Sequence, residues 1–154
     1  MNTKVSVLEF KNKEYLSNAL SSKVSDLLSK KISISDEAWL VVPGGNTPMD
    51  LFDSLSLKNI EWNRVNITLT DERWVKTDSL MSNERLVRNS LLKNKACSAN
   101  FFGLKTSHNS ISEGLNTIKK RLKSFQVPEV LVLGMGLDGH TASMFPNDPN
   151  LTLY

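Results

Sequence analysis

The stretch AWLVVPGGNTPMDLFDSL, residues 38–55, decides the fold of this chain. Its first five residues are apolar without a break, which is typical of a strand that is covered on both faces. Two glycines and a polar pair follow, and the next apolar residues recur at helical spacing. Thr47 is expected to cap this helix, with Pro48 at its first position, where a missing N–H group costs nothing. The stretch predicts a buried strand, a tight loop and a helix with Leu51, Phe52 and Leu55 inside.

The same alternation extends toward both ends of the chain. Further strands are expected at residues 5–10, 65–69, 101–104 and 130–133, and further helices at residues 16–28, 82–93 and 111–125. Strands that alternate with helices indicate parallel crossovers, so the fold class is α/β. With no internal repeat and no interdomain linker, a single domain over residues 1–154 is expected.

Composition narrows the function classes. Of the 154 residues, 40% are hydrophobic and 23% charged, which excludes a disordered, collagen-like or coiled-coil chain. The net charge of +3 is spread along the sequence and fits an anionic metabolite, whereas nothing favours nucleic acid. The lone Cys97 excludes an internal disulfide. No signal peptide or membrane span is found, so a cytoplasmic protein is expected.

Ligands of open α/β sheets gather at the carboxyl ends of the strands, and three loops follow such ends here. The first, residues 44–48, joins a strand to a helix N-terminus, where free N–H groups bind anions, although turn chemistry alone explains the same residues. The second, residues 71–73, offers Asp71 and an Arg73 that can grip a phosphate with paired donors. As a bare tripeptide it is equally typical of surface charge.

The third loop, residues 134–140, matches the glycine pattern of dinucleotide-binding proteins. That pattern requires an acidic residue about twenty positions later, and only fifteen residues follow Gly139, so a nucleotide is disfavoured. His140 is better explained as a group that takes and returns a proton. Asp138 can orient its ring or cap a following helix. His108, in a polar loop, is expected at the surface.

The three loops together resemble the 6-phosphogluconolactonases, of the glucosamine-6-phosphate isomerase/6-phosphogluconolactonase family. The matching segments are GGNTP at 44–48, TDERWV at 70–75 with Ser82-Asn83 after it, and GMGLDGHTASMFP at 134–146. They agree with the family in order and separation and cover the chain almost end to end. Asn46 departs from the pattern, because the family more often has Ser or Arg there.

The resemblance implies a Rossmann-like, three-layer fold with a parallel sheet, shared with the sugar-phosphate isomerases and deaminases. It implies hydrolysis of 6-phosphogluconolactone to 6-phosphogluconate in the oxidative pentose phosphate pathway, without cofactor or metal. The implied catalytic positions are His140 as general base, Asp138 beside it, Arg73 and Asp71. The implied substrate-binding positions are Gly44, Gly45, Asn46, Thr47, Asn83 and Gly136.

Two other functions stay open. Glucosamine-6-phosphate deaminases share the fold, although their sequence after Asp-Gly-His differs from the Thr141–Pro146 segment found here. A sugar-phosphate-binding module without turnover would also keep the loops. Family members continue further, with more strands and a phosphate-binding Lys, so the C-terminal part of the fold is expected to be missing. An exposed sheet edge, self-association or weak stability would follow, and the oligomeric state is left open.

Overall fold

The computed structural model describes residues 5–149 and Leu151, and within them a parallel sheet lies between two layers of helices. The helices are α1 (Lys13–Ser35), α2 (Met49–Ser56), α3 (Asn83–Ser90) and α4 (Ile111–Arg121), with short 3-10 turns η1 (Trp62–Arg64) and η2 (Asn94–Ser98). The strands are β1 (Ala38–Val42), β2 (Val65–Leu69), β3 (Asn100–Phe102) and β4 (Val130–Leu131). The predicted α/β class is confirmed.

The strands run in the order β3-β2-β1-β4, and every pair is parallel. One row across the sheet joins Phe101, Ile67, Leu40 and Val130. Every residue of β1 is buried, as the unbroken apolar run at 38–42 predicts. Every residue of β2 is buried as well, including the polar Asn66 and Thr68. All carboxyl ends therefore lie along one edge of the sheet.

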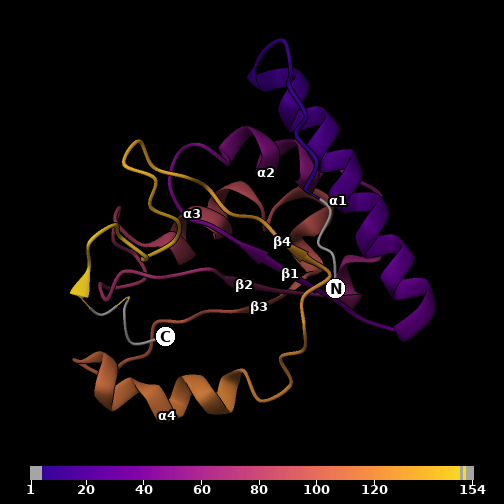
Figure 1. The fold of residues 1–154 in the computed structure, drawn as a ribbon. Helices are drawn as coiled ribbons and strands as arrows, with labels where there is room; N and C mark the ends of the chain where they lie inside the picture. The colour runs from indigo at the N-terminus through magenta and orange to yellow at the C-terminus, as the bar shows by residue number, and fades with distance from the viewer. Residues whose placement is uncertain (1–4, 150, 152–154) are drawn as a thin grey trace.

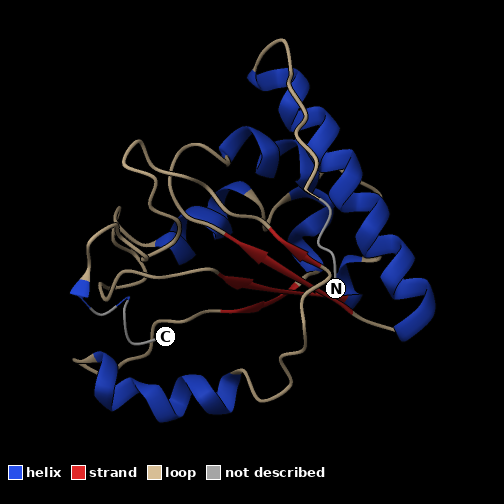
Figure 2. Cartoon of the chain, viewed as in Figure 1, coloured by secondary structure: helices blue, strands red, loops and turns tan. Residues whose placement is uncertain are grey.

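Helices α1, α2 and α3 cover one face of the sheet, and α4 lies on the opposite side (Figures 1 and 2). The main core forms under the first group, where Leu28, Leu40, Phe52 and Ile67 are fully buried. Each such side chain contributes about 1.5–3 kcal/mol by leaving water. This core fixes β1 and β2, which carry two of the three loops.

The face of the sheet toward α4 is less tightly packed with apolar side chains than the opposite face. Ile111 and Leu115 of α4 are 59% and 44% exposed. Trp39 of β1 contacts Phe102 and Phe125 here, with ring centroids 4.9 and 5.0 Å apart. Beside them an open apolar hollow of about 430 Å³ lies between the sheet and the chain after α4.

Some predicted elements are wrong in place or length. Residues 5–10 form no strand, and Val5 and Val7 are 84% and 81% exposed, because an apolar run becomes a strand only where a sheet edge accepts it. Pro48 rather than Thr47 is the N-cap of α2, and no side chain caps that helix. The helices α3 and α4 end earlier than expected, and β4 keeps only two of four predicted residues. None of the described helices is apolar over a length that would cross a bilayer.

Candidate active site

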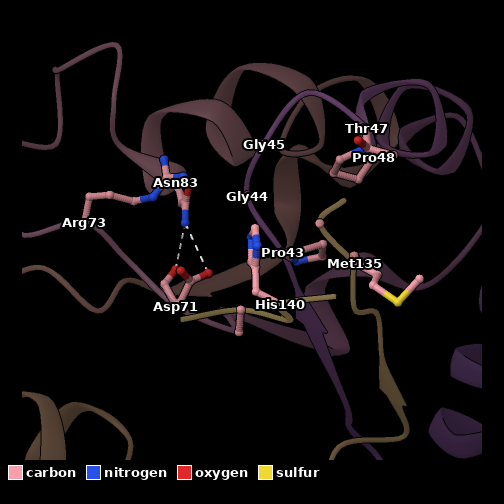
Figure 3. A pocket seen from close by; sticks show the side chains of 13 residues that line it. Pro43, Gly44, Gly45, Thr47, Pro48, Asp71, Arg73, Asn83, Met135 and His140 are labelled. Carbon is pink, nitrogen blue, oxygen red and sulfur yellow. Dashed lines mark hydrogen bonds between the residues drawn. The ribbon is translucent and has the colours of Figure 1, made fainter. Parts of the chain in front are cut away.

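The loops after β1, β2 and β4 meet around a cavity of about 210 Å³, as the sequence predicts (Figure 3). Its lining residues are Pro43, Gly44, Gly45, Thr47, Pro48, Asp71, Arg73, Asn83, Gly134, Met135, Gly136, His140 and Ala142. Eight of the ten predicted site residues are among them. Asp138 is bound to His140 but does not line the cavity, and Asn46 lines a neighbouring pocket with Met49 and Arg85.

The first loop brings backbone close to a side chain from another element. A Cβ at position 44 would overlap the amide group of Asn83, the first residue of α3, so a glycine is needed there. Gly45 has a φ of +83°, which side-chain-bearing residues rarely adopt. Thr47 and Pro48 then lead into α2. The loop is a tight turn, and it also exposes backbone to the cavity.

Asp71 connects the ends of β2, α3 and the third loop. Its Oδ1 accepts hydrogen bonds from the Thr70 hydroxyl at 3.2 Å and from Nδ2 of Asn83 at 3.4 Å. The same Asn83 nitrogen donates to the backbone oxygen of Asp71 at 3.0 Å. Its Oδ2 accepts from the Ser143 hydroxyl at 2.8 Å. Both carboxylate oxygens are therefore engaged.

Glu72, which sequence reasoning did not select, caps α3 with its carboxylate. Its oxygens accept the backbone N–H groups of Asn83 and Glu84, each at 2.8 Å, and the Ser82 hydroxyl at 3.1 Å. Free N–H groups and the positive end of a helix favour an anion at this position. Ser82 is the residue that the local sequence indicates as the cap of α3, and its hydroxyl accepts a hydrogen bond from the Arg85 N–H. No local pattern indicates that Glu72, ten residues earlier, caps the same helix.

Arg73 extends from the same segment into the cavity lining and is exposed. Its Nη1 donates to the backbone oxygen of Met81 at 3.0 Å. Within residues 5–149 no carboxylate forms an ion pair with it. Since a guanidinium group has five N–H donors, most remain available for an anionic ligand.

The third loop closes on itself around His140. The Gly136 N–H donates to the His140 oxygen at 2.8 Å, and a Cβ at position 136 would overlap the imidazole ring. Gly139 has a φ of +86°. Phe145 contacts the ring, with centroids 4.8 Å apart. The helix expected after His140 is wrong, because residues 141–146 form turns and a single bridge between Thr141 and Met144.

Asp138 contacts His140 twice. Its Oδ1 lies 2.6 Å from Nδ1 of the ring and accepts the His140 backbone N–H at 3.2 Å. Hydrogen bonds with His140 lower the pKa of Asp138. The bond with the imidazole ring has the larger effect, and the bond with the backbone N–H has the smaller one. A carboxylate at Nδ1 favours the tautomer with the proton there, which leaves Nε2 as the basic nitrogen. In Figure 3 the ring stands among the cavity-lining residues.

The arrangement combines a cation, a proton acceptor and exposed backbone in one cavity. Arg73 and the loop at 44–48 suit an anionic group, and His140 suits a reaction that needs a general base. Among the residues described, no group of His, Cys, Asp or Glu side chains is arranged to hold a metal ion. His108 is half-buried and bonded to Thr106 outside this cavity.

Comparison with known proteins gives concordant results. The family model described as glucosamine-6-phosphate isomerases/6-phosphogluconolactonase matches residues 11–153. A 6-phosphogluconolactonase from Pseudomonas aeruginosa is 41% identical over 135 residues, which cover 87% of this chain and 57% of that protein. The crystal structure of a 6-phosphogluconolactonase from Shewanella baltica OS155 has a TM-score of 0.89 and 45% identity, covering 94% of this chain and 62% of that one.

A monomeric glucosamine-6-phosphate deaminase has a TM-score of 0.74 at 16% identity and shares the fold alone; the match covers 89% of this chain and 58% of that one. The chain spans about three fifths of the length of the curated relatives it matches.

Proposed function

This chain belongs to the glucosamine-6-phosphate isomerase/6-phosphogluconolactonase family, and from that membership we propose that it hydrolyses 6-phosphogluconolactone to 6-phosphogluconate. The observation that carries the proposal is that His140, with Nδ1 bound to Asp138, and Arg73, which has no ion pair among the described residues, line one cavity. The 6-phosphogluconolactonases from Pseudomonas aeruginosa and Rhizobium meliloti are 41% and 40% identical to it. We assign the reaction to the oxidative pentose phosphate pathway in the cytoplasm. The free thiol of Cys97 is consistent with that reducing compartment.

In this proposal His140 is the general base. Nε2 takes a proton from a water molecule, whose oxygen then forms a bond to the lactone carbonyl carbon. The carbonyl oxygen becomes an oxyanion, and the bond between that carbon and the ring oxygen then breaks. The imidazolium returns the proton to the departing ring oxygen, so the histidine ends as it began.

Asp138 supports both states of the ring. Its hydrogen bond keeps the proton on Nδ1 while Nε2 acts as base, and its negative charge stabilises the imidazolium that forms. An aspartate of ordinary pKa is already ionised at neutral pH, and the hydrogen bonds from His140 lower the pKa of Asp138 further. It therefore acts through His140.

Arg73 and the first loop supply the anion contacts. Arg73 can bind the phosphate or the developing oxyanion, and the backbone at Gly44 and Gly45, with the Thr47 hydroxyl, can bind the other. Asn83 and Gly136 shape the cavity wall between these groups. Asn46, in the neighbouring pocket, has no part in this arrangement.

The other two functions are less well supported. The deaminase is a relative in fold at 16% identity, and the 6-phosphogluconolactonase from Shewanella baltica OS155 is 45% identical. A module that only binds sugar phosphates would not need a carboxylate holding an imidazole at 2.6 Å. We therefore retain hydrolysis as the function.

The test is a direct assay of lactone hydrolysis. Freshly made 6-phosphogluconolactone is followed by NMR or by acid release, with and without the protein, against its spontaneous rate. Hydrolysis above that rate supports the proposal. Ammonia release from glucosamine 6-phosphate would select the deaminase instead, and tight binding of 6-phosphogluconate without turnover would select the binding module.

A further inference from the structure

The segment that carries His140 is attached to the molecule by few contacts. It follows β4, an edge strand of two residues, and many of its side chains are exposed. Its internal hydrogen bonds, such as Thr141 Oγ1 to the Gly134 oxygen at 2.7 Å, close the loop on itself. They fix the shape of the loop, but they do not fix its position over the cavity.

One hydrogen bond supplies that position. The Ser143 hydroxyl donates to Oδ2 of Asp71 at 2.8 Å, across 72 residues of sequence. Among the described residues it is the only hydrogen bond between residues 133–147 and the part of the chain that precedes them. Hydrogen bonds to an ionised acceptor are the stronger kind. Ser143 lies three residues after His140, so it acts close to the ring.

The acceptor belongs to the rigid part of the fold. Asp71 follows β2 by two residues, and its other oxygen and backbone are bound by Thr70 and Asn83. Asn83 begins α3, whose N-terminus is held in turn by Glu72. The bond from Ser143 therefore ends on a group that is held by the neighbouring Thr70 and by the first residue of α3.

We infer that Ser143 is a positioning residue for His140, and that Asp71 is its anchor rather than a proton carrier. The inference rests on the proposed lactonase function. When the bond is present, the loop holds Nε2 over the cavity; without it, the loop spends more time in positions from which His140 does not reach the substrate. Ala142, between His140 and Ser143, has a φ of +51° and lines the cavity.

The variants are Ser143→Ala, which removes the hydroxyl, and Ser143→Thr, which keeps it. Ser33→Ala is the matched control, because that exposed hydroxyl bonds only to Lys30 within α1. Ser143 is itself exposed, so the alanine variant is expected to fold. Amide hydrogen exchange of residues 134–147 is measured first, by mass spectrometry, and lactone hydrolysis second.

In Ser143→Ala, exchange in residues 134–147 should rise about tenfold, and kcat should fall by a similar factor with little change in KM. The pH dependence of kcat should keep its midpoint, since Asp138 still holds His140. Ser143→Thr should restore both readouts. Unchanged exchange in the alanine variant would overturn the inference whatever the activity, and raised exchange with full kcat would overturn the positioning role. If the wild-type chain shows no hydrolysis, the proposed function fails, while the exchange result still tests the attachment.

Discussion

Oδ1 of Asp138 lies 2.6 Å from Nδ1 of His140, only two residues along the chain, and the same oxygen accepts the His140 backbone N–H. This short-range contact fixes the ring through one local turn. Glycines at positions 136 and 139 make the turn possible, the first by leaving room for the imidazole and the second by its positive φ. The base of the proposed reaction is thus oriented from within its own loop.

Replacing His140 by alanine should remove the general base. We expect kcat to fall by about 10²–10⁴-fold with a small change in KM, as is usual for loss of such a group. The lactone assay measures this against the spontaneous rate. His108→Ala is the control and should keep full activity, because His108 lies outside the cavity. Equal rates for wild type and His140→Ala would remove His140 from the mechanism.

Asp138→Asn should change how stability depends on pH. Hydrogen bonds from His140 lower the pKa of Asp138 below its ordinary value of 3.8, so the folded state favours the carboxylate. The stabilisation is complete above that ordinary value and disappears as the pH falls through the lowered pKa. The measurement is urea unfolding between pH 2 and pH 6, which extends about two units to either side of the ordinary pKa of an aspartate. The free energies of unfolding of the variant and the wild type should become equal at the acid end. A constant difference across the series would contradict this.

Gly44→Ala should displace Asn83, because the added methyl group overlaps its amide. Forcing such an atom into a packed site costs about 1–3 kcal/mol, which urea unfolding can measure. Gly134→Ala is the matched comparison in stability, since a Cβ there meets nothing within 4 Å. If both variants are equally stable, Asn83 moves aside freely, and the close approach of loop and helix is not a constraint.

Arg73→Ala tests which anion the guanidinium group binds. A contact with the phosphate should raise KM and leave kcat nearly unchanged, whereas a contact with the oxyanion should lower kcat. Arg73→Lys keeps the charge but loses the paired donors, so it should recover only part of the loss. Full activity of Arg73→Ala would exclude both contacts. Arg64→Ala, which removes an arginine paired with Glu61 outside the cavity, controls for the loss of one positive charge.

Glu72→Gln should weaken the start of α3. The neutral amide accepts hydrogen bonds less strongly and loses the charge that the helix N-terminus favours, so we expect a loss of about 0.5–2 kcal/mol in the free energy of unfolding. Glu113→Gln, in the first turn of α4, is the comparison, because no hydrogen bond to its side chain is described. KM should rise in Glu72→Gln if Asn83 shifts with the helix end. Identical unfolding of the two variants would contradict the capping role.

The sequence predicts the parts of the fold that depend on local pattern. Residues 38–42 are an unbroken apolar run and residues 65–69 alternate apolar with polar side chains, and both are buried strands. Residues 5–10 have a similar composition but find no neighbouring strand, which a local pattern does not reveal. The loops meet because parallel strands share one carboxyl edge, so His140, Arg73 and Gly44 were predictable together.

Contacts between distant segments were not predictable in the same way. Glu72 caps a helix that begins eleven residues later, and Ser143 reaches Asp71 across 72 residues. Neither spacing corresponds to a local motif, and both depend on how the strands are ordered in space. Asn46 has the right residue type for the cavity, but its side of the turn faces the adjoining pocket.

The shortness of strand β4 affects the order in which parts of the site unfold on heating. His140 depends on a short edge strand and one hydrogen bond, while Arg73 and Gly44 depend on the fully buried β1 and β2. Segments with few buried contacts open locally at a lower free-energy cost than the core. On warming, the molecule should therefore lose its proton acceptor from the cavity while its anion-binding groups are still in place. For the proposed reaction, hydrolysis of the lactone should therefore stop at a lower temperature than binding of its phosphate.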